Sequence, residues 1–152
     1  MPIFEAAVEF ACPPATLFDF LTRPVNLVRI SPPELHARLV AAPERISVGS
    51  RITIEARKLG MRHRLTTVIV ALEPDRLVVD EQVEGPFRKY RHERRLKEIA
   101  GGVMLSERID YEPPGGMIGL LLTRARVEEY IVEMHDYGRR AMQTLLNPAT
   151  DR

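Results

Sequence analysis

The residues best suited to chemistry lie at alternate positions of one segment, 87–99. Tyr90, His92 and Arg94 would share one face of a β-strand there, because successive side chains of a strand point to opposite sides. The opposite face carries only charged residues and is expected to meet water: Lys89, Arg91, Glu93, Arg95 and Lys97. A phenol, an imidazole and a guanidinium that point inward are costly to bury unless each finds a partner or water. The segment therefore predicts an internal cavity lined by polar groups.

A carboxylate is expected to join this polar face from the next segment, 103–111. Its inward face is predicted to carry Leu105, Glu107, Ile109 and Tyr111. A hairpin turn at Gly101-Gly102 would place Leu96 opposite Glu107, so that Arg94 and Glu107 would be diagonal neighbours within reach of each other. Two interpretations stay open. These groups line a ligand pocket, or they form an internal ion pair that only holds two strands in register.

The composition is that of one ordinary globular domain, expected to span residues 1–152. The formal net charge of +1 gives no general attraction to nucleic acid, and the basic run 88–95 is interpreted as the wet face of a sheet. Cys12 is the only cysteine, which excludes an intrachain disulfide and a cysteine-rich metal site. The four histidines show no metal-binding spacing. Neither a metal nor a cofactor is therefore predicted.

No targeting or membrane segment is visible in the sequence. The N-terminal residues lack a basic stretch followed by an apolar run, which a signal peptide would show. The longest apolar run, around 120–122, is far too short to span a membrane. We therefore expect a cytoplasmic protein without a membrane span. The sequence gives no indication of its oligomeric state.

The hydrophobic pattern predicts the elements that position the polar residues. Strands are expected at 3–10, 35–41, 51–59, 61–72, 77–83, 87–99 and 103–111, and two short helices at 15–21 and 24–30. A long C-terminal helix is expected because apolar residues recur at helical spacing: Leu120, Val127, Ile131, Met134, Met142 and Leu145. Successive hairpins form an antiparallel sheet, and a twisted sheet of seven strands curls. The predicted fold is α+β, with the sheet wrapped around the long helix.

A set of local motifs then points to a known family. The motifs are Asp80 and Gln82, Gly85-Pro86-Phe87, Tyr90 and His92, Glu107, Tyr111 and Pro113-Pro114-Gly115-Gly116. With this order of elements, the chain resembles the START-like, helix-grip superfamily, also called SRPBCC, over essentially its whole length. That superfamily includes lipid-transfer domains, polyketide cyclases and pollen-allergen-like proteins. The motifs are most similar to those of an uncharacterised bacterial branch of ligand-binding proteins.

Three positions depart from the pattern of that branch. Tyr90 stands in place of a tryptophan, Arg94 in place of a second histidine, and His63 where another tryptophan is expected. These replacements make the expected cavity more polar.

The resemblance implies that a small hydrophobic or amphipathic molecule binds between the sheet and the C-terminal helix. Tyr90, His92, Arg94 and Glu107 would orient its polar end. The full set of expected ligand-binding residues is Tyr90, His92, Arg94, Glu107, Tyr111, His63, Asp80, Gln82, Ile131 and Met134. His135 is interpreted as an ordinary surface or cavity-facing histidine rather than a metal ligand.

Two alternatives to a binding protein remain. One is a polyketide cyclase or aromatase-like enzyme that uses His92 as acid or base. The other is a protein-interaction module without a ligand. The sequence contains no nucleophile motif of the Gly-x-Ser-x-Gly type. Whether a reaction is catalysed therefore stays open at this point.

Overall fold

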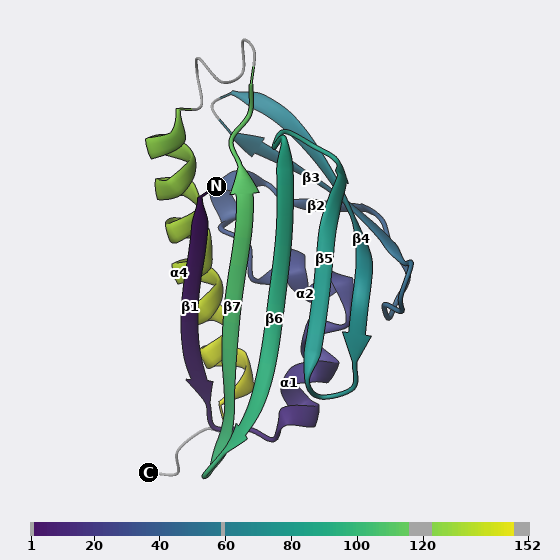
Figure 1. Cartoon of the computed structure of the whole chain (residues 1–152), viewed down its shortest axis with the longest axis vertical. Helices are drawn as coiled ribbons and strands as arrows, with labels where there is room; N and C mark the ends of the chain where they lie inside the picture. Colours follow the sequence, from purple (N-terminus) through teal and green to yellow (C-terminus); the bar gives the residue numbers. More distant parts are fainter. Residues whose placement is uncertain (1, 59, 116–122, 148–152) are drawn as a thin grey trace.

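A curved antiparallel sheet forms the frame of the molecule (Figure 1). Within residues 2–58, 60–115 and 123–147, which the computed structural model describes, the sheet has seven strands in the order β1-β7-β6-β5-β4-β3-β2. The strands are β1 (Ile3–Phe10), β2 (Arg38–Ala41), β3 (Arg51–Lys58), β4 (Met61–Glu73), β5 (Leu77–Glu84), β6 (Lys89–Ile99) and β7 (Gly102–Glu112). The first strand pairs with the last. The predicted antiparallel arrangement is therefore confirmed.

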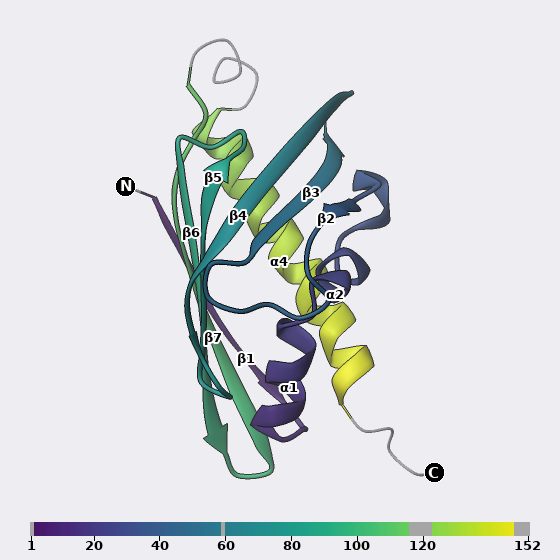
Figure 2. The same ribbon diagram turned by 90° about the vertical axis from the view of Figure 1, so that its right-hand side faces the viewer.

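Helices lie on the concave side of this sheet. They are α1 (Pro14–Leu21), α2 (Pro24–Arg29), the 3-10 turn η1 (Pro33–Leu35) and the long α4 (Arg124–Leu146). Figure 2 shows β3 and β4 leaving the direction of the other strands and curving over α4. Prolines occupy the first turns of α1 and α2, where a missing N–H costs nothing. The two short helices and the long C-terminal helix are thus confirmed.

The predicted strand 35–41 is wrong in its first half. Pro33–Leu35 form a 3-10 turn instead, and the strand begins only at Arg38. Proline fixes its own φ and donates no hydrogen bond, so Pro32-Pro33 turns the chain before a ladder can form. His36 ends the turn in the left-handed conformation, with φ 47°.

The predicted C-terminal helix is confirmed from Arg124 onward. Thr123 caps it, because its Oγ1 accepts a hydrogen bond from the backbone N–H of Arg126 at 3.4 Å. The expected start near Leu120 lies outside the described residues.

The register of β6 against β7 differs from the prediction by two residues. Arg94 pairs directly with Glu107, and Leu96 pairs with Leu105. The turn lies one residue earlier than expected, because Gly102 already belongs to β7 and pairs with Ile99. A Cβ on Gly102 would overlap the carbonyl oxygen of Phe10, so this position in the strand requires glycine. The consequence is a closer approach of the two charged side chains than the sequence suggested.

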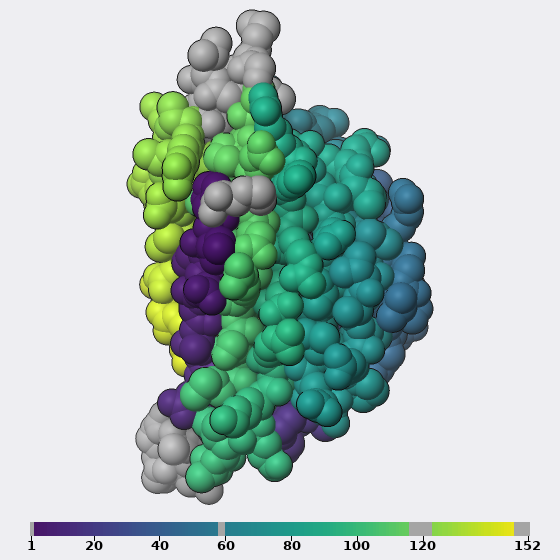
Figure 3. Space-filling model, viewed as in Figure 1, coloured from purple at the N-terminus to yellow at the C-terminus, as the bar shows by residue number. Residues whose placement is uncertain are grey.

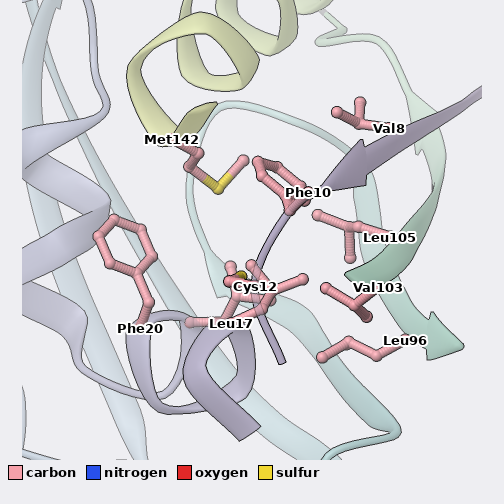
Figure 4. Close-up of a cluster of buried hydrophobic side chains, with 10 residues drawn as sticks. Val8, Phe10, Cys12, Leu17, Phe20, Leu96, Val103, Leu105 and Met142 are labelled. Atoms are coloured by element: carbon pink, nitrogen blue, oxygen red, sulfur yellow. The ribbon is translucent and has the colours of Figure 1, made fainter. Parts of the chain in front are cut away.

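A hydrophobic cluster closes one end of the space between sheet and helices (Figure 4). It joins β1, α1, β6, β7 and the last turns of α4: Val8, Phe10, Cys12, Leu17, Phe20, Leu21, Leu96, Val103, Leu105 and Met142. A smaller cluster fixes the beginning of α4, where Val127 and Ile131 pack with Ile109 and Tyr111. The helix is therefore held at both ends, and its middle faces the interior of the sheet.

The outer face of the sheet is charged, as predicted. Figure 3 looks onto this face, with α4 visible only along one edge. Arg91 contacts Glu81 at 3.2 Å and Glu93 at 3.3 Å, and Arg95 contacts Glu93 at 2.9 Å. Such pairs at the surface contribute little to stability. No helix among the described residues is both long and apolar enough to cross a membrane.

Candidate ligand-binding cavity

Two adjoining cavities lie between the concave face of the sheet and α4. The inner cavity has a volume of about 240 Å³ and the outer cavity about 530 Å³. They share six lining residues: Ser31, Ile54, Leu65, Phe87, Tyr130 and Met134. Because the same residues line both, the two cavities are adjacent, and we call them the inner and outer compartments. Most of their lining residues are apolar and come from β3 to β7, α2 and α4.

The inner cavity holds the polar face that the sequence predicted. Tyr90, His92 and Arg94 line it from β6, Glu107 from β7 and Asp80 from β5. The antiparallel register brings them together, because Asp80 pairs with His92 and Arg94 with Glu107. Side chains of paired residues point to the same face of a sheet. Three neighbouring strands therefore present five polar groups to one compartment, and we call Asp80, His92, Arg94 and Glu107, with His135 of α4, the polar cluster.

Glu107 is the centre of the polar cluster. Its Oε1 lies 3.2 Å from Nε2 of His92 and 3.3 Å from Nε of Arg94. Its Oε2 lies 2.7 Å from Nε2 of His135. The contact with His92 has hydrogen-bond geometry, whereas Arg94 Nε and His135 Nε2 are within ion-pair distance but out of line for a hydrogen bond. Both carboxylate oxygens are thus occupied by basic groups.

The ionised form of Glu107 is strongly favoured in this setting. Burial alone would raise the pKa of the carboxyl group, since only 7 % of the residue is exposed. The contacts with His135 and His92 outweigh that effect, together with the charges of His92 and Arg94, and hold the pKa of Glu107 well below its usual range. Glu107 is therefore expected to carry its negative charge over the whole neutral range.

Arg94 lies between two carboxylates. Its Nη1 donates a hydrogen bond to Oδ1 of Asp80 at 3.3 Å, on the side away from Glu107. The three side chains are nearly enclosed, with exposed fractions of 13 % for Arg94, 12 % for Asp80 and 6 % for Glu107. The sequence left open whether Glu107 would occupy Arg94, and both carboxylates do so. One guanidinium group thus contacts two buried carboxylates.

Tyr90 has the opposite character, because its polar atom is unoccupied. Its ring packs at 5.1 Å from the ring of Phe87 and edge-on at 6.3 Å from that of His92. Among the described residues, no hydrogen bond reaches its hydroxyl group. Burial, helped by the charges of Asp80 and Glu107, raises the pKa of Tyr90 above that of a free phenol. The hydroxyl is therefore a neutral hydrogen-bonding group available to a guest.

The remaining predicted residues are divided among three places. Ile131 and Met134 line the inner cavity from α4, and Met134 also reaches the outer one. His63 lines the outer cavity only. Tyr111 is buried in the cluster at the beginning of α4, and it lines neither cavity.

Gln82 is placed away from both cavities by its hydrogen bonds. Its Nε2 donates to the carbonyl oxygen of Phe87 at 2.7 Å, and its Oε1 accepts from the N–H of Phe87 at 3.2 Å. This reciprocal pair closes the β5–β6 loop, which carries Pro86 and Phe87 to the wall of the outer cavity. Gln82 therefore holds the loop that forms part of the wall, and it lines neither cavity itself.

His135 is a cavity-facing residue that the expected ligand-binding set did not include. It lines the inner cavity, contacts Glu107, and packs its ring 5.0 Å from that of Phe4. A signal was present, because His135 follows Ile131 by four residues and Val127 by eight, on the buried stripe of the helix. A polar residue at such a position calls for an internal partner.

The cluster is suited to orienting a polar group or to moving a proton. An imidazole held by a carboxylate has a fixed orientation and is a better base than a free one. Among the described residues, no group of His, Cys, Asp and Glu side chains is arranged to hold a metal ion.

Comparisons with known proteins agree with this picture. The sequence model of one family, described as polyketide cyclase / dehydrase and lipid transport, matches residues 1–145. No curated protein matches the sequence.

Several solved structures share the fold across almost the whole chain. Protein CV1439 from Chromobacterium violaceum is 14% identical with a TM-score of 0.77, covering 97% of this chain and 98% of its own. A START superfamily protein from Mycobacterium smegmatis is 13% identical with a TM-score of 0.72, covering 95% and 96%. The major latex-like protein 151 from Panax ginseng is 14% identical with a TM-score of 0.70, covering 97% and 98%. At these identities the likeness concerns the fold, a curved sheet around a long C-terminal helix.

Proposed function

Because the chain belongs to the polyketide cyclase/dehydrase and lipid transport family, we propose that it binds a small hydrophobic or amphipathic molecule between the sheet and α4. One observation carries the proposal: two adjacent cavities with mostly apolar walls lie between sheet and helix, and the polar cluster lines the inner one. Ligand sites in proteins combine a mostly apolar lining with a few polar groups that fix orientation. An interaction module without a ligand gives no reason for such an interior. Cytoplasmic location, expected from the sequence, stays part of this proposal.

In this proposal the two compartments have different tasks. The outer cavity and the apolar part of α4, with Ile131 and Met134, enclose the body of the guest. Met134 suits this task because its side chain adapts to irregular shapes. Tyr90 and His92 contact the polar end, while Glu107 holds His92 in place and is itself held by Arg94.

The direct test is to identify what the protein carries. Native mass spectrometry of the purified protein, followed by organic extraction, is expected to reveal a bound small molecule. The variant Ala56→Trp adds bulk to the wall of the outer cavity and should reduce the amount carried. Val70→Trp is the matched control, because Val70 is exposed on β4 and lines neither cavity. Equal loading of both variants would contradict the proposed site.

A second candidate function is a cyclase- or dehydratase-like reaction. The contact between His92 and Glu107 favours it, because a carboxylate that orients an imidazole is a common arrangement for general acid–base catalysis. His92 would then accept a proton from the substrate and return it at a later step. Turnover of a poly-ketone analogue should be lost in both His92→Ala and Glu107→Ala. Turnover that survives both substitutions would rule out this role.

A further inference from the structure

We propose that the polar end of the bound molecule is an uncharged hydrogen-bonding group, a hydroxyl or a ketone, and that Asp80 selects against carboxylates. This inference rests on the proposed function and narrows it to one class of ligand.

The fixed charges of the inner cavity do not favour a third acid. Asp80 and Glu107 supply two negative charges, and Arg94 supplies one positive charge. With neutral imidazoles the cluster is left with one uncompensated negative charge, and one imidazolium would only balance it. A ligand carboxylate would be balanced only if His92 and His135 were both protonated. Like charges brought together in a desolvated site repel each other strongly.

Arg94 has one positive charge for two buried acids. Nη1 donates to Asp80 and Nε lies 3.3 Å from Glu107, which leaves Nη2 without a hydrogen bond within the described residues. A two-point contact with a ligand carboxylate would have to take Nη1 from Asp80 or Nε from Glu107. The carboxylate left behind would stay buried without its positive partner, since Asp80 and Glu107 are 9 % and 7 % exposed. Breaking a buried ion pair from one side is strongly destabilising. The guanidinium is therefore a fixed part of the protein in this site, and not a docking group for acids.

The atoms that remain free are suited to a neutral group. The hydroxyl of Tyr90 has no hydrogen bond within the described part of the chain and can donate one to a ketone or accept one from a hydroxyl. His92 and His135 turn Nε2 toward Glu107, and no hydrogen bond within the described residues occupies Nδ1 of either ring. In a neutral imidazole with its hydrogen on Nε2, Nδ1 is an acceptor, which fits a ligand hydroxyl.

A cationic group on the ligand would also find poor contacts, although the polar cluster has two acids and only one permanent positive charge. Both oxygens of Glu107 already meet basic groups, and Oδ1 of Asp80 accepts a hydrogen bond from Arg94. An ammonium group would find Oδ2 of Asp80 and would stand beside the guanidinium. An uncharged polar end of the bound molecule is therefore the best match to the polar cluster.

The first experiment compares matched probes on two apolar bodies. Calorimetry at pH 8 measures the affinity for octanol, octanoate and octylamine, and for 2-naphthol, 2-naphthoate and 2-naphthylmethylamine. We expect the alcohol or phenol of each series to bind at least about tenfold more tightly than the acid, which corresponds to 1.4 kcal/mol. An acid or an amine that binds most tightly would overturn the inference and leave the proposed function intact. Failure of every probe in both series would overturn the proposed function and the inference with it.

The second experiment removes one of the two acids that share Arg94. In Asp80→Asn the guanidinium keeps only Glu107, so the affinity for octanoate should rise at least about tenfold while that for octanol changes little. Glu81→Gln is the matched control, with the same change of charge at the next residue of β5. Its side chain pairs with Arg91 on the outer face. The control should leave all affinities unchanged.

The result with Asp80→Asn decides the role of Asp80. An unchanged affinity for octanoate in a folded Asp80→Asn protein would overturn the selection by Asp80. If that variant does not fold, the ranking of the probes by the unmodified protein still decides whether acids are disfavoured. A rise in octanoate affinity in the Glu81→Gln control as well would show a general effect of charge, and would equally overturn a specific role of Asp80.

Discussion

Glu107 of β7 meets His135 of α4 at 2.7 Å, across the space that separates the sheet from the helix. The same carboxylate contacts His92 and Arg94 of the neighbouring strand. Glu107 therefore ties the polar face of the sheet to the middle of α4, where the hydrophobic clusters at the two ends of the helix do not reach. A single buried carboxylate contributes both to the fold and to the shape of the cavity.

Replacing Glu107 by glutamine should destabilise the protein by about 3 kcal/mol or more, because Arg94 would lose one of its two buried anionic partners. Denaturant unfolding followed by circular dichroism measures the change. Glu98→Gln removes the same charge from an exposed position of β6 and should change the free energy of unfolding by less than about 0.5 kcal/mol. Similar effects of the two substitutions would contradict the central place of Glu107.

Stability should fall in acid, and Glu107 should account for part of that fall. Its pKa lies well below the ordinary value of 4.5 in the folded protein, so the unfolded chain takes up the proton first as the pH falls. The stabilisation is therefore complete above about pH 5 and is lost as the pH falls through the pKa of the folded state. Urea unfolding between pH 6 and pH 3 should show a weaker dependence on pH for Glu107→Gln. If the free energy of unfolding depended on pH in the same way in the unmodified protein and in Glu107→Gln, this role of Glu107 would be contradicted.

Tyr90→Phe should weaken ligand binding and leave the stability of the fold almost unchanged. The ring contacts with Phe87 and His92 stay, and only an unpaired hydroxyl is removed, so the free energy of unfolding should change by less than about 0.5 kcal/mol. Loss of one hydrogen bond to the guest should weaken ligand binding by about three- to tenfold, measured by calorimetry. Tyr111→Phe is the control, because Tyr111 is buried but lines neither cavity. Weaker binding by this control alone would place the guest elsewhere.

Gly102→Ala should be much more damaging than Gly101→Ala. A Cβ at position 102 would overlap the carbonyl oxygen of Phe10, where β1 lies against β7, so the backbone must shift. Position 101 is open, and alanine there meets only the strain of φ 79°, about 1 to 2 kcal/mol. Thermal unfolding of the two variants checks the order. Equal melting temperatures would contradict the close approach of β1.

Gly138→Ala should stabilise α4 by about 0.5 to 1 kcal/mol, since glycine is unfavourable inside a helix. The added Cβ would lie 3.5 Å from the carbonyl oxygen of Ile30, an ordinary contact. Gly138 lines the inner cavity, so a guest that fills this compartment should bind less tightly to the variant. A loss of stability on denaturant unfolding would contradict the free space seen beside the glycine.

Local patterns predicted most of the fold, because alternation and helical spacing depend on neighbours in the sequence. The polar face of β6 followed from the spacing of Tyr90, His92 and Arg94 alone. The register of β6 and β7 did not, since the sequence did not show that Gly102 belongs to β7, where it lies against Phe10, a residue far away in the chain. The role of His135 required the position of α4 over β7, which packing at both ends of the helix determines.

The unequal packing at the two ends of α4 has a kinetic consequence. Within the described residues, the cluster around Met142 contains ten buried residues, whereas the cluster around Val127, beside the outer cavity, contains four. Opening the first turns of the helix then disrupts a smaller cluster than opening its last turns. Backbone amides near Val127 should therefore exchange with solvent faster than those near Met142. The rate of ligand entry would then follow this local opening rather than global unfolding.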